Sequence, residues 1–367
     1  MSPGREPGSR RGRSCRWPRR HSGGAGASAE TAGLQTFAGT GQNTFSVRQC
    51  QSDGPRGRWR QEANVAQNSI GHRIGWIGVG RMGRPLATRL LEAGCDVAVY
   101  NRTRSKAEAL ADLGAAIVGT PRDLADRDIV FSTVAGPADF TAVMLDGATG
   151  VLSDAKTAPR LLVDCSTISA EASAEVRAAA TARGATLMAA PISGNGRHVA
   201  SGGALFAVSG PEAGMATVRP YLEILGRGAH YVGDADSARL VKIAHNLFLG
   251  AVIQSLVETS LLVEAGGISR RAYLDFINDS PMGSAFSSYK TPALVDLDWT
   301  ATFTSQLLRK DLDLGLETAA AADLELPVTQ AVRAQLQAAV AAGHADDDFA
   351  ALLAVQAREA GIDLRPA

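Results

Sequence analysis

The stretch Ile74-Gly-Trp-Ile-Gly-Val-Gly-Arg-Met-Gly-Arg84 decides the fold of this 367-residue chain. Gly78, Gly80 and Gly83 stand in the spacing G-x-G-x-x-G, directly after an apolar run that is typical of a buried parallel strand. The first glycine permits a tight turn, the second lets backbone N–H groups approach a pyrophosphate, and the third packs a helix against the strand. A helix-compatible segment follows and ends at Gly94. The stretch therefore predicts a dinucleotide-binding βαβ unit rather than a Gly-rich turn without a ligand.

Strand-like and helix-like patterns alternate from this stretch to Gly233. We predict strands at Arg73–Gly78, Asp96–Asn101, Ile129–Val134, Leu161–Cys165, Thr186–Ala190, Ala204–Ser209 and His230–Val232. The helices expected between them are Met82–Ala93, Arg104–Leu113, Ala138–Leu145, Ala170–Arg183 and Pro211–Leu225. This alternation indicates a mostly parallel sheet with helices on both faces.

The sequence changes character after Gly233. Residues 236–264 contain Gly250 but no proline and are apolar on most faces, which predicts a long helix buried between domains or subunits. The segments expected beyond it are all helical: Arg270–Asn278, Phe303–Ala322, Pro327–Ala342 and Phe349–Ala360. The predicted fold class is α/β, with an N-terminal doubly wound Rossmann domain (71–234), a long connecting helix and a C-terminal all-α domain for substrate binding and oligomerisation (235–367).

Residues 1–70 are rich in Arg, Gly, Ser and Pro and poor in aliphatic side chains. Such a segment buries too little apolar surface to offset its ordering entropy, so we predict a disordered Arg/Gly-rich tail. A translated region ahead of a later start, an organelle transit peptide and a nucleic-acid-binding arm are alternative interpretations.

The composition is that of a soluble enzyme. Formal net charge is zero, and the 37 basic residues include only five lysines. The four cysteines show neither C-x-x-C spacing nor a disulfide framework, and the six histidines form no metal-binding pattern. No uninterrupted apolar run reaches the ~18 residues of a membrane helix. We therefore expect a cytoplasmic enzyme with no metal site and no membrane or nucleic-acid partner.

The residues after the second predicted strand bear on the choice of cofactor. In this fold an acid at that position selects NAD by bonding the ribose 2′-OH, but the chain has Asn101-Arg102-Thr103 there. The Arg102 guanidinium and the Thr103 hydroxyl, with Arg104 and Lys106 close behind, suit a 2′-phosphate, so we predict NADP (NADPH) rather than NAD. The same segment could also cap the following helix, with Thr103 as its N-cap.

Four separated stretches resemble the β-hydroxyacid dehydrogenase family, which includes 3-hydroxyisobutyrate dehydrogenases, tartronate semialdehyde reductases and glyoxylate/succinic semialdehyde reductases. They are Gly78–Gly83, Asp164–Thr167, Ala190–Gly194 and Lys242–Asn246. A fifth, Lys310-Asp311-Leu312 with Phe303 upstream, is similar to the motif that closes over the family's cofactor. The resemblance extends from Ile74 to about Gly361 and implies an NAD(P)-dependent oxidoreductase.

The resemblance implies that Lys242 is the general acid/base. The role is chemically sensible, because hydride transfer to a carbonyl carbon leaves an alkoxide, which an ammonium group can stabilise and protonate. Asn246 lies four residues later on the same helix face and can orient Lys242 or bind the substrate oxygen. A solvated surface lysine is the alternative, but the neighbouring side chains are apolar.

The resemblance also assigns the substrate carboxylate to Ser193 and Gly194, with Asn195 beside them. Asn195 stands where many members have glycine, and Ala190 where many have aspartate. His245 replaces a common asparagine, and we interpret it as a packed polar residue, although its spacing from Lys242 could bring it to the site.

Further residues are assigned to the cofactor by the resemblance. Val134 and Pro137 lie below one ribose, Thr167 contacts the nicotinamide ribose, and Lys310, fixed by Asp311, closes over the nicotinamide with Phe303. The alternative for Lys310 and Asp311 is a surface ion pair. The complete set of expected cofactor-binding residues is Gly78, Gly80, Arg81, Met82, Gly83, Asn101, Arg102, Thr103, Val134, Pro137, Thr167, Phe303, Lys310 and Asp311.

The predicted reaction interconverts a small 3-hydroxy or 2-hydroxy acid with its semialdehyde or keto form. The expected partners are a small carboxylated substrate and further copies of the chain, in a homodimer or homotetramer. Two alternatives remain: an imine reductase, in which the family lysine is typically replaced, and a non-catalytic dehydrogenase-like scaffold with a basic tail. The presence of Lys242 argues against the first, and Lys242, Asn246 and the intact glycines argue against the second.

Overall fold

The computed structural model describes residues 71–367, so the tail predicted at 1–70 lies outside the described residues. A nine-stranded sheet has the order β3-β2-β1-β4-β5-β6-β8-β7, with β9 paired to β8. Its strands are β1 (Ile74–Ile77), β2 (Val97–Tyr100), β3 (Ala116–Ile117), β4 (Ile129–Ser132), β5 (Leu161–Asp164), β6 (Thr186–Ala189), β7 (Ile192–Ser193), β8 (Leu205–Ser209) and β9 (Gly228–Gly233).

The sheet is mostly parallel, and it turns antiparallel only where β8 meets β6 and β7. Every residue of β1, β4 and β5 is buried, as expected for strands that are covered on both faces. The strand order reverses at β1, between β2 and β4. Ligands of doubly wound folds bind outside the carboxyl ends of the strands at this point.

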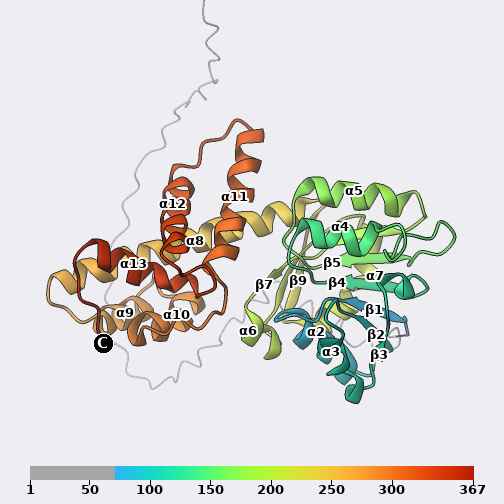
Figure 1. Ribbon diagram of the computed structural model, residues 1–367, viewed down its shortest axis with the longest axis horizontal. Helices are drawn as coiled ribbons and strands as arrows, with labels where there is room; N and C mark the ends of the chain where they lie inside the picture. Colours follow the sequence, from blue (N-terminus) through green and yellow to red (C-terminus); the bar gives the residue numbers. More distant parts are fainter. Residues whose placement is uncertain (1–70) are drawn as a thin grey trace, which may run out of the picture. The chain divides into compact units, whose positions relative to one another are not determined.

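Helices cover both faces of the sheet (Figure 1). On one face α2 (Gly83–Glu92) and α7 (Glu212–Leu225) pack over a core in which the rings of Trp76 and Phe131 stack with centroids 5.4 Å apart. On the other face α4 (Pro137–Leu145) and α5 (Ala170–Thr181) enclose a second core around Phe140. The predicted doubly wound Rossmann fold is confirmed.

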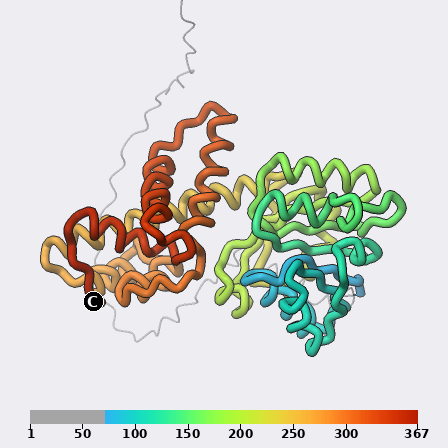
Figure 2. Tube along the Cα trace, viewed as in Figure 1, coloured from blue at the N-terminus to red at the C-terminus, as the bar shows by residue number. Residues whose placement is uncertain are grey.

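The chain then enters α8 (Ser237–Ala265), a single helix of 29 residues that leads into the helical part (Figure 2). Side chains such as Ile253, Leu308 and Leu336 form a third core there. The helices that follow α8 are α9 (Arg270–Asp279), α10 (Ala285–Asp296), α11 (Ser305–Ala321), α12 (Pro327–Ala341) and α13 (Leu352–Glu359). The predicted all-α region after the long helix is confirmed.

The expectation that α8 is buried nearly all round is wrong for one of its faces. Leu240 is 55% exposed and Phe248 71% exposed, while Ile243, Gly250 and Ile253 are buried. The helix is also long and apolar enough, by length and composition, to cross a membrane, which the search for an uninterrupted apolar run missed. A core helix of a globular protein has the same properties, and α8 contacts α9, α11, α12 and α13.

Several elements of the structure were not predicted from the sequence, most of them because they are short. Strands β3 and β7 have two residues each, and helix α6 (Gly196–Ala200) has five, too few for a hydrophobic period to appear. Helix α10 was missed because Pro292 lies inside it. The predicted helix Arg104–Leu113 is divided into α3 (Arg104–Glu108) and a 3₁₀ turn at Ala111–Leu113.

Candidate active site

The glycine-rich loop follows β1 and has room for a ligand. A Cβ atom at Gly78, where φ is +89°, would collide with the carbonyl oxygen of Thr133, and one at Gly83 would collide with the carbonyl oxygen of Gly78. At Gly80, by contrast, a Cβ would meet no atom within 4 Å. The outer glycines are thus required by close packing, whereas Gly80 borders open space where a pyrophosphate can approach the backbone.

Asn101, directly after β2, shapes this loop. Its Oδ1 accepts a hydrogen bond from the backbone N–H of Val79 at 3.0 Å, and its Nδ2 donates to the carbonyl oxygen of Thr103 at 2.8 Å. Asn101 therefore fixes the backbone around the expected ribose position, and both ends of its amide already have protein partners.

Arg102 and Thr103 lie beside Asn101 with their polar groups toward solvent. The Arg102 side chain is 84% exposed and pairs with Asp139 of α4 at 3.0 Å. Thr103 is the N-cap residue of α3, but its side chain makes no capping hydrogen bond. The alternative role of Thr103 as a helix-capping hydroxyl is therefore not realised, and no carboxylate follows β2 at residues 101–103.

Val134 and Pro137 lie where β4 passes into α4. The Val134 N–H donates to Ser166 Oγ at 2.8 Å, and Pro137 occupies the first turn of α4. Met82 stands at the other helix start, as the N-cap residue of α2, and packs partly buried against the sheet core. The structure brings the loops that follow β1, β2 and β4 to one edge of the sheet, as a Rossmann cofactor site requires.

A cluster of buried polar side chains around Asp164 and Arg239 lies next to this edge of the sheet. Asp164, fully buried at the end of β5, accepts hydrogen bonds from Ser132 Oγ at 2.6 Å and from Ser166 Oγ at 2.8 Å. Its other oxygen accepts from Arg239 Nη1 of α8 at 2.7 Å. Arg239 is 4% exposed and also reaches Asp236 at 3.1 Å. The cluster ties the first turn of α8 to the ends of β4 and β5.

Arg239 was not identified from the sequence. Its only signal was a charged side chain three residues before Lys242 in an otherwise apolar helix start. Because i and i+3 residues lie one above the other on a helix, the Arg239 cluster fixes the turn that carries Lys242.

Lys242 lies half-buried on α8 and makes no hydrogen bond to any residue in the range 71–367. Burial lowers the pKa of its ammonium group from 10.5 to about 8, against the opposing attraction of Asp311 and with a smaller lowering by Lys310. A lysine with such a pKa can both donate and accept a proton near neutral pH.

A run of hydrogen bonds links Lys242's neighbours to the predicted carboxylate site. Asn246 Nδ2 donates to Asp311 Oδ2 of α11 at 2.5 Å. Asn246 Oδ1 lies 3.0 Å from His245 Nδ1, and His245 Nε2 lies 3.1 Å from Ser193 Oγ. The interpretation of His245 as a packed polar residue is wrong, because it is exposed and faces Ser193.

Lys310 connects the helical part to the sheet edge. Its Nζ donates to the carbonyl oxygen of Thr167 at 3.2 Å and forms an ion pair with Asp311 Oδ1 at 3.0 Å. The pairing is not that of a surface helix, because Asp311 is 2% exposed. The partly buried ring of Phe303 packs edge-on against Phe349, with centroids 6.0 Å apart, at the core of the helical part.

Asn195 caps α6 by accepting the His198 N–H at 2.9 Å, next to Gly194, whose φ is +133°. Tyr289 of α10, which no sequence motif marked, faces Asn195. Burial raises the pKa of the Tyr289 hydroxyl to about 12, although hydrogen bonds with Thr302 and Asn195 oppose the shift. Tyr289 therefore presents a neutral hydroxyl beside the expected substrate position.

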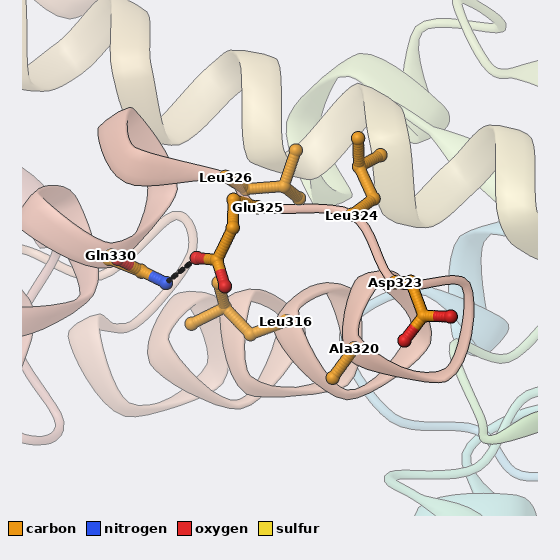
Figure 3. Close-up of a pocket in the computed structure, with 7 residues that line it drawn as sticks. All are labelled: Leu316, Ala320, Asp323, Leu324, Glu325, Leu326 and Gln330. Atoms are coloured by element: carbon orange, nitrogen blue, oxygen red, sulfur yellow. Dashed lines mark hydrogen bonds between the residues drawn. The ribbon is translucent and has the colours of Figure 1, made fainter. Parts of the chain in front are cut away.

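Arg81 of the glycine-rich loop adds another contact with the helical part, since its Nη1 donates to the carbonyl oxygen of Ala301 at 3.3 Å. A cavity of about 460 Å³ lies apart from all these residues, at the end of α11 and the turn into α12. Figure 3 shows its lining, in which Gln330 donates to Glu325 at 3.1 Å. The lining includes the carboxylates of Asp323 and Glu325, and it shares no residue with the predicted cofactor and substrate sites.

The glycine loop, the buried ties beneath it and the lysine on α8 define the class of NAD(P)-binding oxidoreductases. Residues 73–233 match the family described as the NAD-binding domain of 6-phosphogluconate dehydrogenase. Residues 237–356 match the family described as the NAD-binding domain of NADP-dependent 3-hydroxyisobutyrate dehydrogenase.

Individual relatives agree with these family matches. The chain is 30% identical over 289 residues to 3-hydroxyisobutyrate dehydrogenase of Pseudomonas aeruginosa, covering 76% of this chain and 96% of the relative. It is 29% identical over 294 residues to glyoxylate/succinic semialdehyde reductase 2 of Arabidopsis thaliana, covering 78% and 81%. The crystal structure of 3-hydroxyisobutyrate dehydrogenase from Salmonella typhimurium matches with a TM-score of 0.70 at 26% identity, over 77% of this chain and 99% of the other.

The chain thus belongs to the β-hydroxyacid dehydrogenase family, to which 3-hydroxyisobutyrate dehydrogenases belong, and it is an NAD(P)-dependent oxidoreductase of hydroxy acids.

Proposed function

We propose that the chain interconverts a small 3-hydroxy or 2-hydroxy acid with its semialdehyde or keto form, that it prefers NADP, and that Lys242 is the general acid/base. The observation that carries the proposal is Lys242 itself. It is half-buried, its pKa is about 8, and it makes no hydrogen bond within residues 71–367. A buried lysine without a function would cost stability.

The bound nicotinamide supplies the hydride in reduction and accepts it in oxidation. In reduction, the Lys242 ammonium donates a proton to the substrate's carbonyl oxygen, and in oxidation the neutral amine takes the hydroxyl proton. The oxygen carries its largest negative charge in the transition state, so the ammonium also stabilises that charge. Asn246, oriented by Asp311 at 2.5 Å, is positioned one helical turn away to help hold the oxygen.

Ser193 and Gly194 are proposed to bind the substrate carboxylate, with Asn195 next to them. The Ser193 hydroxyl lies 3.1 Å from His245, which stands three residues after Lys242 and directly before Asn246 on α8. Named substrates of the relatives are carboxylic acids, among them 3-hydroxyisobutyrate and succinic semialdehyde. A carboxylate anchored at Ser193 would orient the reacting carbon of such a substrate toward Lys242.

The preference for NADP rests on the end of β2. Arg102 offers an exposed guanidinium, Thr103 a hydroxyl without a capping partner, and no acid is present to bind a ribose diol. Guanidinium groups bind phosphate through charge-assisted, often paired, hydrogen bonds. Arg81, Val134 and Thr167 are proposed to complete the cofactor site at the neighbouring strand ends.

We further propose a homodimer or homotetramer in the cytoplasm. The apolar face of α8 left exposed by Leu240, Val241 and Phe248 is the feature that a second copy would cover.

The deciding experiment follows NADPH oxidation with a panel that includes succinic semialdehyde, glyoxylate and methylmalonate semialdehyde. We expect turnover with at least one of them and a loss of kcat on the order of 10² or more in Lys242→Ala. Lys156→Ala, an exposed lysine on a loop, serves as the matched control and should keep full activity.

The alternatives give different results in the same experiment. Turnover only when an amine is supplied with the carbonyl compound would indicate an imine reductase. Binding of NADPH without turnover of any substrate would favour a non-catalytic scaffold. Equal activity of Lys242→Ala and the wild type would contradict the role given to Lys242.

A further inference from the structure

The hydrogen bonds between Asp311 and Ser193 have a fixed polarity that starts at Asp311. A carboxylate oxygen of Asp311 faces the Asn246 amide at 2.5 Å and can only accept. The Asn246 side chain must therefore turn its Nδ2 toward Asp311, and its Oδ1 toward His245. Because Asn246 and Asp311 are each 2% exposed, solvent cannot substitute for either partner.

The orientation of Asn246 determines which nitrogen of His245 carries a proton. Asn246 Oδ1 lies 3.0 Å from His245 Nδ1 and can only accept, so Nδ1 is the protonated nitrogen. A neutral imidazole has one N–H, which leaves His245 Nε2 as an acceptor. Ser193 Oγ, 3.1 Å from Nε2, must then donate its hydroxyl proton to His245.

This polarity has a direct consequence for the substrate. With neutral His245, Ser193 has only lone pairs left for a ligand, and a carboxylate needs donors. When His245 is protonated, Nε2–H donates to Ser193 Oγ, and the hydroxyl proton becomes free to donate to a carboxylate. We infer that His245 is a positioning residue that sets the polarity of Ser193, and that a carboxylated substrate binds together with one proton taken up at His245. The inference rests on the proposed binding of the carboxylate at Ser193.

The groups around His245 determine its protonation state in the enzyme without substrate. The charge of Lys242, on the same helix, acts on it, Lys310 and Asp311 lie beyond Asn246 on α11, and His198 of α6 lies beside Gly194. Desolvation first, and then the charge of Lys242, lower the pKa of His245, while the Asn246 hydrogen bond opposes them. His245 is therefore mostly neutral at pH 7 in the free enzyme. An incoming carboxylate raises its pKa, so a proton is taken up on binding.

Isothermal titration of the full-length protein tests this inference. The enzyme saturated with NADPH is titrated at pH 7 with 3-hydroxyisobutyrate, L-serine or glycolate, which cannot react with the reduced cofactor. Comparing buffers of different ionisation enthalpy gives the number of protons taken up. We expect more than about half a proton per site in the wild type. Lys242, with a pKa of about 8, supplies at most about one-tenth of a proton at this pH.

The variant His245→Asn should bind the same acid with proton uptake near zero, because an asparagine side chain can donate to Ser193 at any pH. The matched control is His230→Asn, an exposed histidine on β9, which should take up as many protons as the wild type. In steady-state assays the wild-type KM for the carboxylated aldehyde should rise by up to about tenfold per pH unit above the His245 pKa. The KM of His245→Asn should not depend on pH in this range. If His245 had only a structural role, the substitution would not remove the pH dependence of KM.

Two results would overturn the inference. The first is acid binding to the wild type without proton uptake, which alone is decisive even if the variant fails to fold. The second is undiminished uptake in His245→Asn. Failure of the proposed function gives a third, distinct pattern, in which NADPH binds but none of the three acids does.

Discussion

The pKa of Lys242 is set by opposing effects of its burial and of the neighbouring charges. Removal of water lowers the pKa of its ammonium group to about 8. The carboxylate of Asp311 raises this pKa, but by less than the burial lowers it. Asp311 is also held by Asn246 and Lys310, so part of its charge is already compensated. As a result, the pKa of Lys242 lies close to physiological pH.

This pKa predicts opposite pH profiles for the two directions of the reaction. Reduction needs the ammonium, so kcat/KM for an uncharged aldehyde should fall as pH rises through about 8. Oxidation of the corresponding alcohol needs the free amine, so kcat/KM should rise through the same pH. Initial rates between about pH 6 and 10 measure both limbs. Profiles that run in the same direction would exclude Lys242 as the titrating group.

At the same scale, Arg102 is the residue proposed to give the preference for NADP. The variant Arg102→Ala removes the guanidinium expected at the 2′-phosphate, which is worth about 1.5–3 kcal/mol for a hydrogen bond to a charged group. The KM for NADPH should therefore rise on the order of tenfold or more, whereas the KM for NADH should change little. Arg271→Ala, which removes an exposed arginine of α9 paired with Asp296, is the control. A parallel loss for both cofactors would contradict the assignment.

At the scale of elements, α8 is joined to the sheet through the Arg239 cluster. Arg239 is 4% exposed and its Nη1 lies 2.7 Å from a fully buried Asp164. The helix that carries Lys242 thus begins at a fixed point beneath the strand ends, and the same cluster holds the Val134 loop through Ser166.

Removal of this tie should destabilise the protein strongly. In Arg239→Met the carboxylate of Asp164 stays buried without its cation, which costs about 3–5 kcal/mol. Thermal unfolding should show a clear fall in Tm, and kcat should drop because the Lys242 turn loses its anchor. Arg122→Met removes a pair that is half exposed, so its Tm should barely move. Equal changes in both variants would show that the cluster is not a structural anchor.

The sequence was sufficient for elements with strong periodic or motif signals, such as the strand and loop around Gly80 and the long helix after Gly233. It was insufficient where tertiary contacts decide. Helix α10 contains Pro292 and has no apolar stripe, yet a capping box at Ser284 starts it. Tyr289 reaches Asn195 only because α10 folds back to the sheet edge, and no spacing along the chain encodes that approach.

At the scale of the whole molecule, one face of α8 stands out. Leu240 is 55% exposed and Phe248 71% exposed, and Ala244 lies between them at helical spacing, so the three share a face. Exposed apolar faces of this kind commonly mark an interaction surface.

We expect the wild type to have a mass in solution of at least twice 38.1 kDa. Phe248→Glu should shift it toward the monomer, since burying the new carboxylate in the interface is costly. Light scattering after size-exclusion chromatography measures both. Leu324→Glu, at an exposed position on the turn after α11, should leave the mass unchanged. A monomeric wild type at tens of micromolar would refute the proposed assembly.

The length of α8 and the position of its anchor set how far a tilt of the helical part would move Lys242. The 29 residues of the helix span about 43 Å, and Lys242 lies only about 8 Å from the anchored start. If the helical part tilts by about 5° around that anchor, the far end moves by about 4 Å, whereas Lys242 moves by less than about 1 Å. Lys242, the proposed acid/base, lies close to the anchored end of α8, so a tilt of the outer helices would displace it little.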